Sequence, residues 1–328
     1  MTRPDRLSLT RLIAACAVTA AALLPTPAIA QDRYPGQPIT LIVPFNAGGG
    51  TDLVARAFAE ALKLHLGQPV TVQNLPGAGS AVGTTKLHGS KPDGYTLGMT
   101  GGFLVTTTLR GQAKFSATDL THLARLSLET FVLAVPAASP YRTLAEYLEA
   151  ARKAPGSVSL GTAGAGALTH LAAAALSQKS GARLNIVHFA GGAKEVAAVL
   201  GGHAASGAFS QVEVLPHAVA GGGLRVLATF GETRSEKLPE VPTLKEQGIV
   251  GVPAGPWQGI AAPKDLPAPH RATLVAAITR AAQEASWKAF LQQSGLASHF
   301  LTGAGLDAFL KQEIETLGAL LKSVEITQ

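Results

Sequence analysis

The sequence predicts an α/β protein with two lobes, each built on a mostly parallel sheet flanked by helices. Three observations predict this fold. Short apolar runs rich in β-branched residues alternate with amphipathic stretches of helical period, which is typical of a parallel sheet covered on both faces. Gly-rich loops join the two kinds of segment, and the same order returns after Pro136. The chain of 328 residues is long enough for about two domains of ordinary size.

The first set of elements begins with the buried strand Ile39–Val43, which stops at Pro44. Thr51 or Asp52 can cap the helix that follows, and Gly67 ends that helix as a C′ residue. The alternation continues with two further strands and the start of one further helix. We expect strands at 70–73 and 95–99, a helix from residue 81, and loops at 46–50 and 74–80.

The second set begins after Pro136 and repeats the alternation. The last two amphipathic stretches have no counterpart earlier in the chain. We expect strands at 157–160, 184–189 and 224–229, and loops at 161–167 and 190–192. We expect helices at 168–178, 269–284 and 305–323, and a further helix that follows the loop 190–192 and runs through Leu200.

Composition excludes several classes of protein. With 47% hydrophobic and 15% charged residues the chain is not disordered. A single Cys excludes a disulfide scaffold and a cysteine-built metal site. The net charge of +6 is scattered, without a basic run interleaved with aromatics, so nucleic acid is not expected as a partner.

The N-terminus resembles a secretory signal peptide. Arg3, Arg6 and Arg11 precede an uncharged run from Leu12 to Leu24, and an Ala-x-Ala site ends at Ala30. We therefore expect residues 1–30 to be removed. An uncleaved anchor is the alternative, although the run is shorter than the ~20 residues that a membrane span needs. A lipoprotein site at Cys16 is a second alternative. No later stretch of the sequence could span a membrane.

The Gly-rich loops follow the carboxyl ends of predicted strands, where open parallel sheets bind ligands. Gly lets the backbone approach a ligand, and the free N–H groups of a helix start attract anions. Four or five such loops predict a cleft with anion-binding walls. The alternative is that Gly only closes tight turns.

Catalytic and cofactor motifs are absent from the sequence. Gly77, Gly79 and Gly83 lack dinucleotide-fingerprint spacing, and there is no phosphate loop, nucleophile elbow or HExxH pair. We expect no catalytic residue, cofactor or metal. His170 could donate to a ligand or form a structural hydrogen bond, His188 fits packing, and Asp52 fits a helix cap better than a catalytic carboxylate.

The segment from Pro44 to Asp52 resembles the PFxxGGxxD opening of the tripartite tricarboxylate transporter substrate-binding proteins, also called the Bug family. The resemblance continues in order through most of the chain that follows the predicted signal peptide. It is carried by residues 66–70, 74–79, 91–97, 164–166 with His170 and Leu171, 200–203, 224–228 and 238–243; the segment 213–216 is closer to the tricarboxylate branch.

The resemblance implies a type II-like periplasmic binding protein whose ligand cleft lies between lobe I, residues 31–131 plus 241–328, and lobe II, residues 132–240. It also implies a small carboxylate held by backbone N–H groups of the strand-end loops. The predicted ligand-binding residues are Phe45, Asn46, Ala47, Gly48, Gly49, Thr51, Asp52, Pro76, Gly77, Ala78, Gly79, Ser80, Thr100, Gly101, Thr162, Ala163, Gly164, Ala165, Gly166, Ala167, His170, Phe189, Gly191, Gly192, Lys194 and Phe209.

Three positions depart from the family pattern. Ala167 replaces the usual Ser, Lys194 replaces a neutral or acidic residue, and Phe209 stands where many relatives have Asp, Gly or Asn. We hypothesise that Lys194 contacts a second anionic group, with a solvated side chain as the alternative, and that Phe209 shapes an apolar part of the pocket.

The function that the resemblance implies is a monomeric, non-enzymatic periplasmic receptor. It would deliver a di- or tricarboxylate or a related organic acid to the permease subunits of a tripartite tricarboxylate transporter. A receptor that serves a signalling partner and a secreted hydrolase on a similar fold are the alternatives.

Overall fold

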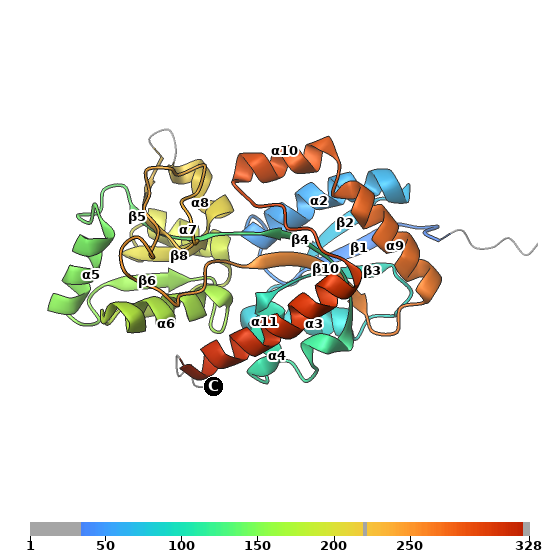
Figure 1. Ribbon diagram of the computed structural model, residues 1–328, viewed down its shortest axis with the longest axis horizontal. Helices are drawn as coiled ribbons and strands as arrows, with labels where there is room; N and C mark the ends of the chain where they lie inside the picture. Colours follow the sequence, from blue (N-terminus) through green and yellow to red (C-terminus); the bar gives the residue numbers. More distant parts are fainter. Residues whose placement is uncertain (1–33, 219–221, 324–328) are drawn as a thin grey trace, which may run out of the picture. The chain divides into compact units, whose positions relative to one another are not determined.

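A computed structural model describes residues 34–218 and 222–323. The described residues from 37 onward form one compact unit built on two five-stranded sheets (Figure 1). The predicted signal peptide lies outside the described residues. Within the described residues, every helix is too short or too polar to cross a membrane.

The first sheet has the strand order β2-β1-β3-β10-β4. β1 pairs in parallel with β2 and β3, whereas β10 is antiparallel to both β3 and β4. Along the chain, α2, α3 and α4 follow β1, β2 and β3, and η2 leads into β4. The strands are β1 Ile39–Val43, β2 Val70–Asn74, β3 Thr96–Gly101, β4 Leu120–Leu128 and β10 Trp257–Pro263; the helices are α2 Gly50–Leu66, η1 Ala78–Ser80, α3 Ala81–His88, α4 Gly102–Leu109 and η2 Ala117–Asp119.

The second sheet repeats this plan in the order β7-β6-β8-β5-β9. β6 is parallel to β7 and β8, and β5 is antiparallel to β8 and β9. The strands are β5 Phe131–Pro136, β6 Ser159–Thr162, β7 Asn185–His188, β8 Ser206–Ser210 and β9 Leu224–Thr229; the helices are α5 Leu144–Lys153, α6 Leu168–Ser180, α7 Gly192–Leu200 and α8 Gln211–Ala218.

The predicted α/β fold with two helix-flanked sheets is confirmed, and three neighbouring strands of each sheet are parallel as expected. Both sheets are mixed, because one strand in each, β10 in the first and β5 in the second, runs opposite to the other four. The sequence patterns do not identify β4, β5, β8 or β10. β8 and the middle of β10 consist largely of Gly, Ala and Ser, which have little intrinsic preference for strands.

Two segments connect the sheets, and they lie side by side. The chain passes from β4 to β5 at residues 129–130 and returns to β10 through residues 254–256. The Glu129 N–H donates to the Pro256 carbonyl at 2.8 Å, and the Phe131 N–H donates to the Ala254 carbonyl at 2.8 Å. The two connections therefore form a short hydrogen-bonded ribbon.

The C-terminal helices pack on elements of the first sheet. They are α9 Ala268–Ala281, α10 Ala285–Ser294 and α11 Gly303–Ser323. α9 and α10 contact α2, while α11 contacts α4 and β4. The ring of Trp287 in α10 lies edge-on to Phe58 of α2, with centroids 4.9 Å apart, and both side chains are fully buried. These contacts bury the apolar faces that the sequence periodicity predicts.

Candidate functional site

Three helices in each half of the molecule begin where a parallel strand ends. α2, α3 and α4 follow β1, β2 and β3, and α6, α7 and α8 follow β6, β7 and β8. The N-cap residues of α2, α6 and α7 are Gly49, Ala167 and Gly191, and none of them accepts a side-chain capping hydrogen bond. Their first-turn N–H groups are therefore available to other acceptors.

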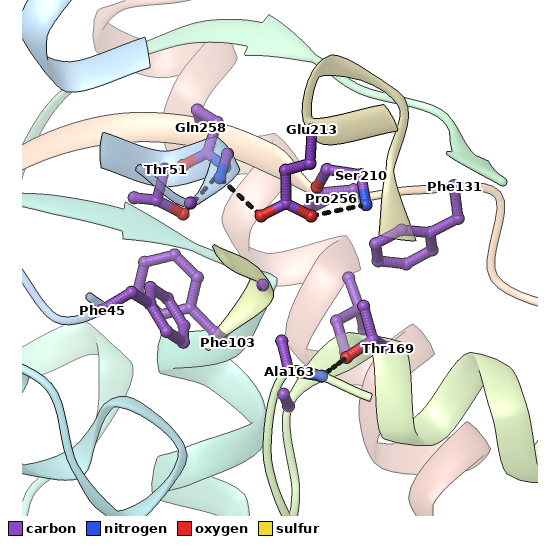
Figure 2. A pocket seen from close by; sticks show the side chains of 15 residues that line it. Phe45, Thr51, Phe103, Phe131, Ala163, Thr169, Ser210, Glu213, Pro256 and Gln258 are labelled. Atoms are coloured by element: carbon purple, nitrogen blue, oxygen red, sulfur yellow. Dashed lines mark hydrogen bonds between the residues drawn. The ribbon is translucent and has the colours of Figure 1, made fainter. Parts of the chain in front are cut away.

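The starts of these helices line a cavity that we call the inner pocket (Figure 2). It leaves about 50 Å³ for the centres of water-sized molecules, enough for several waters or a small organic ligand group. Its walls come from both halves of the molecule. The lining residues are Phe45, Gly49, Gly50, Thr51, Phe103, Phe131, Ala163, Ala167, Leu168, Thr169, Gly192, Ser210, Glu213, Pro256 and Gln258.

The sides of the inner pocket are aromatic. Phe45 and Phe103 meet edge to face with ring centroids 5.0 Å apart, and Phe131 lies on the opposite side (Figure 2). Phe103 and Phe131 are buried, whereas Phe45 is partly exposed. This arrangement suits the hydrocarbon part of a ligand better than a uniformly charged one.

The ends of the inner pocket are polar. At one end the Thr169 hydroxyl accepts a hydrogen bond from the Ala163 N–H at 3.0 Å. At the other end Gln258 Nε2 donates to Thr51 Oγ1 at 3.2 Å and to Glu129 Oε1 at 3.0 Å. Gln258 Oε1 has no hydrogen-bond partner among the described residues, which leaves an acceptor that a ligand or water can satisfy.

Glu213 is the acidic residue of this lining. Its Oε1 accepts the Gly50 N–H at 2.6 Å, and its Oε2 accepts the Ser210 N–H at 3.2 Å. Glu213 is partly exposed, and it borders the inner pocket. Burial raises the pKa of Glu213 to about 7, with Glu129 adding to the increase and the two N–H groups opposing it.

A second cavity, the outer pocket, shares Phe45 and Ala163 with the inner pocket. It leaves about 320 Å³ for the centres of water-sized molecules. Loops from both halves line it. The lining residues are Phe45, Pro76, Gly77, Ala78, Gly79, Ser80, Gln112, Ala163, Gly164, Ala165, His188, Phe189, Ala190 and Gly191.

The structure brings fifteen of the predicted ligand-binding residues to these two pockets. The inner pocket contains Phe45, Gly49, Thr51, Ala163, Ala167 and Gly192; the outer pocket adds Pro76, Gly77, Ala78, Gly79, Ser80, Gly164, Ala165, Phe189 and Gly191. The other predicted residues line neither pocket: Asn46, Ala47, Gly48, Asp52, Thr100, Gly101, Thr162, Gly166, His170, Lys194 and Phe209.

Asp52 is a cap within its own half of the molecule. Its carboxylate accepts hydrogen bonds from the Gly48 N–H at 2.8 Å, Asn74 Nδ2 at 2.8 Å and Arg56 Nε at 2.9 Å. Burial acts to raise the pKa of Asp52, but the hydrogen bonds from Arg56, Gly48 and Asn74 hold it below its ordinary value. Asp52 therefore stays ionised and fixes the loop that leads into α2.

His170 also has an internal partner, because its Nδ1 accepts the Gly166 N–H at 3.0 Å. Burial, together with the nearby His188 and Arg110, lowers the pKa of His170 to about 4. His170 is therefore neutral at ordinary pH, and its contact is the structural hydrogen bond that the sequence left as an alternative.

Lys194 and Phe209 lie in contrasting surroundings. Lys194 is exposed on α7. Phe209 is fully buried in an apolar cluster that includes Val132, Val196 and Val214. Neither side chain reaches a described pocket, so their proposed ligand contacts stay predictions without a supporting contact in this structure.

Several pocket residues are not found by sequence reasoning. They are Phe103, Phe131, Leu168, Thr169, Ser210, Glu213, Pro256 and Gln258 in the inner pocket, and Gln112 in the outer pocket, together with His188, for which a packing role was expected. One signal was available: Ser210-x-x-Glu213 has the S-x-x-E spacing of a helix start. Recognising it would have placed α8, and with it the acidic wall. The described residues contain no cluster of His, Cys, Asp and Glu that could hold a metal ion.

Comparison with known proteins identifies the family. Residues 54–326 match the family described as "Tripartite tricarboxylate transporter family receptor". The chain belongs to this receptor family. Its members are periplasmic solute-binding receptors, not enzymes.

Individual relatives agree with this family. The "UPF0065 protein in gbd 5'region" of Cupriavidus necator is 37% identical over 252 residues, which is 76% of each chain. The solved structure of the periplasmic binding protein BugD has a TM-score of 0.85 at 27% identity, covering 90% of this chain and 99% of BugD. MatC from Rhodopseudomonas palustris, solved with bound malate, has a TM-score of 0.80 at 25% identity and covers 88% of this chain and all of MatC (100%).

Proposed function

We propose that this receptor captures a small organic acid in the inner pocket and delivers it to the membrane subunits of a tripartite tricarboxylate transporter. The observation that carries the proposal is the convergence of the starts of α2, α6 and α7 on one cavity. Backbone N–H groups and aligned peptide dipoles at helix starts favour a carboxylate. The malate in MatC supports the same ligand class.

We assign ligand contact to the pocket-lining residues, and we treat the two pockets as one ligand path joined at Phe45 and Ala163. The carboxylate meets N–H groups, and the hydrocarbon part meets Phe45 and Phe103. The absence of Lys and Arg from the described pocket linings fits a site that uses helix starts in place of cationic side chains.

We further propose that the two sheets mark two lobes that close on the ligand about the ribbon at residues 129–131 and 254–256. The paired hydrogen bonds of these segments support a hinge there. This placement puts the return crossing further along the chain than residue 240, so that residues 241–253 would belong to the second lobe.

Export through a cleaved signal peptide of residues 1–30 and a monomeric state complete the proposal. The charged start, apolar run and Ala-x-Ala site support export. Mass spectrometry of the protein recovered from the periplasm tests it, with a mature N-terminus at Gln31 as the expected result.

Thermal unfolding of the receptor against a panel of carboxylates tests ligand capture. The panel contains tricarboxylates, C4-dicarboxylates, acidic amino acids and aromatic acids. A ligand at a hundred times its Kd adds about 2.7 kcal/mol of stability, which raises Tm by roughly 5 °C for a chain of this size. A shift with one chemical class supports the proposal. If protein shown by mass spectrometry to be ligand-free shifts with none of these acids, the inner pocket is not a carboxylate site.

A further inference from the structure

Glu213 joins the starts of two helices that belong to different sheets. Through Oε1 it holds the Gly50 N–H of α2, and through Oε2 it holds the Ser210 N–H that precedes α8. A Cβ atom on Gly192, at the start of α7, would lie 1.9 Å from Oε1. The carboxylate therefore lies between the starts of α2, α7 and α8, and a residue larger than Gly at position 192 would overlap it.

The surroundings of Glu213 are acidic. Glu129, in the connection between β4 and β5, and Glu195, in α7, are both buried, and each interacts electrostatically with Glu213. On α2, the nearest acid is Asp52, which is already paired with Arg56. No Lys or Arg of the described chain lines the inner pocket. The Glu213 end of the pocket thus has no positive side chain to accept a second ligand carboxylate.

The opposite end of the pocket has the other character. Figure 2 shows Glu213 and Ser210 at one end, Ala163 and Thr169 at the other, and aromatic rings between them. The start of α6 at Ala167–Thr169 has no side-chain cap, so it can receive a carboxylate. A ligand that spans the pocket therefore places its carboxylate at α6 and its other end against Glu213.

An ionised carboxylate only accepts hydrogen bonds. Each Glu213 oxygen receives one N–H and keeps a lone pair for the pocket. A group with an N–H or O–H satisfies that lone pair, whereas a second carboxylate brings two like charges together at a largely buried position.

We propose that Glu213 sets the substrate class of this receptor: organic acids with one carboxylate and, at the far end, a hydrogen-bond donor such as an amide, ammonium or hydroxyl group. This inference rests on the proposed capture of an organic acid. It excludes as preferred ligands those di- and tricarboxylates that must place a second carboxylate against Glu213.

Isosteric ligand pairs test the proposal. Succinate and its monoamide, and adipate and its monoamide, differ only in the group that meets Glu213. Calorimetric titration of the purified receptor should give the monoamide at least about tenfold tighter binding than its dicarboxylate. In Glu213→Gln the amide N–H can donate to a carboxylate, so the preference should fall by at least about tenfold, a difference of about 1.4 kcal/mol.

The matched control is Glu146→Gln. Glu146 has the same position in the first turn of α5, where its carboxylate accepts the N–H groups of Arg142 and Thr143, and it is exposed and outside both pockets. This variant removes a capping carboxylate without touching the site, so its ligand preference should match that of the wild type.

The wild type offers a second test that needs no variant. Between pH 6.5 and 8.5 the ligand carboxyls are already ionised, while Glu213, whose pKa burial raises to about 7, loses its proton. The pKa of the neighbouring Glu129 is also raised to about 7, so its ionisation adds negative charge beside Glu213 over the same range. The dicarboxylates should lose affinity relative to the monoamides as pH rises.

The outcomes separate the two proposals. A wild type that favours dicarboxylates, or a preference that neither Glu213→Gln nor pH alters, overturns the role of Glu213 and leaves the receptor function standing. Failure of every acid and monoamide to bind overturns both.

Discussion

Helices α4 and α8 follow strands at equivalent positions of the two sheets, but their first turns present different side chains to the inner pocket. α4 follows β3 and presents the apolar ring of Phe103 to the inner pocket. α8 follows β8 and presents the carboxylate of Glu213. The repeated sheet therefore supplies positions for ligand contact, and the residue in the first turn decides whether the wall is apolar or acidic.

A second comparison shows why an acidic first turn alone does not make a site. Asp52 in α2 and Glu213 in α8 are both acidic residues at helix starts. The Asp52 carboxylate accepts the Gly48 N–H of its own loop and pairs with Arg56. The Glu213 carboxylate accepts the Gly50 N–H of α2, on the other sheet's half of the molecule, and lines the inner pocket. The partner of the carboxylate, not its place in the helix, separates a cap from a candidate ligand contact.

Substituting Gly192 should have the largest effect, because it removes the space that Glu213 occupies. In Gly192→Ala the new Cβ would overlap the Glu213 carboxylate, so the side chain must leave its seat between the helix starts. We expect a loss of ligand affinity of about a hundredfold or more and a loss of about 1–3 kcal/mol of stability, measured by calorimetry and denaturant unfolding.

The control for this substitution is Gly305→Ala in α11. A Cβ there would meet Leu301 at an ordinary 3.7 Å, so this variant should bind normally and be slightly more stable. Equal ligand affinity of Gly192→Ala and Gly305→Ala would show that the position of the Glu213 carboxylate does not affect ligand binding.

The acidic wall should make stability fall with pH. The folded-state pKa of Glu213, about 7, lies above the ordinary value of 4.5 for a glutamate side chain. The native state then holds more protons than the unfolded chain between these values, so the free energy of unfolding decreases as pH rises from about 4.5 to 7. Glu213→Gln should remove about 1–3 kcal/mol of this decrease, measured by urea unfolding at pH 5 and pH 8.

The pH comparison has an internal reference. Glu129 also has a pKa raised to about 7 by burial, so part of the decrease should remain in Glu213→Gln. Glu146→Gln should follow the wild-type profile. A Glu213→Gln profile parallel to the wild type would mean that Glu213 is not the titrating group.

The apolar wall should contribute a smaller effect. Phe45 is partly exposed and packs edge-on against Phe103, so Phe45→Ala removes ligand contact without opening the main core. We expect about a tenfold loss of affinity, equivalent to about 1.4 kcal/mol, for ligands with a hydrocarbon body. Affinity that stays within twofold would show that the hydrocarbon part of the ligand does not contact Phe45.

The smallest effect is expected at Lys194, which follows the start of α7 but points to solvent and lines neither pocket. Lys194→Ala should change affinity less than twofold and stability by less than about 0.5 kcal/mol. A loss of affinity confined to ligands with two carboxylates would instead support its hypothesised contact with a second anionic group.

The sequence predicts the α/β scaffold well where local patterns are strong. β1 and β9 have the expected bounds, because apolar β-branched runs end at clear breaks. The strands β8 and β10 escape prediction because they are held by neighbours on both sides and not by their own propensity. Ser210 of β8 and Gln258 of β10 line the inner pocket, and they were not predicted because their strands were not predicted.

The candidate site is predictable in part for the same reason. Gly-rich loops are visible as sequence, and most of them do lie at the two pockets. The direction of a first-turn side chain depends on partners that are distant in the chain, such as Gly50 for Glu213. Residue type and spacing do not encode that partner, so Asp52 and Glu213 cannot be separated from sequence alone.

The ribbon formed by residues 129–131 and 254–256 has a consequence for how such a receptor communicates. Two chain segments are joined there by two hydrogen bonds, and in the proposed hinge we expect them to bend together about one axis. We therefore expect opening and closing to follow a single angle, whatever acid fills the pocket. If the proposed membrane partner docks on the closed form, we expect it to recognise the angle between the lobes, so that the ligand is selected before the two proteins meet.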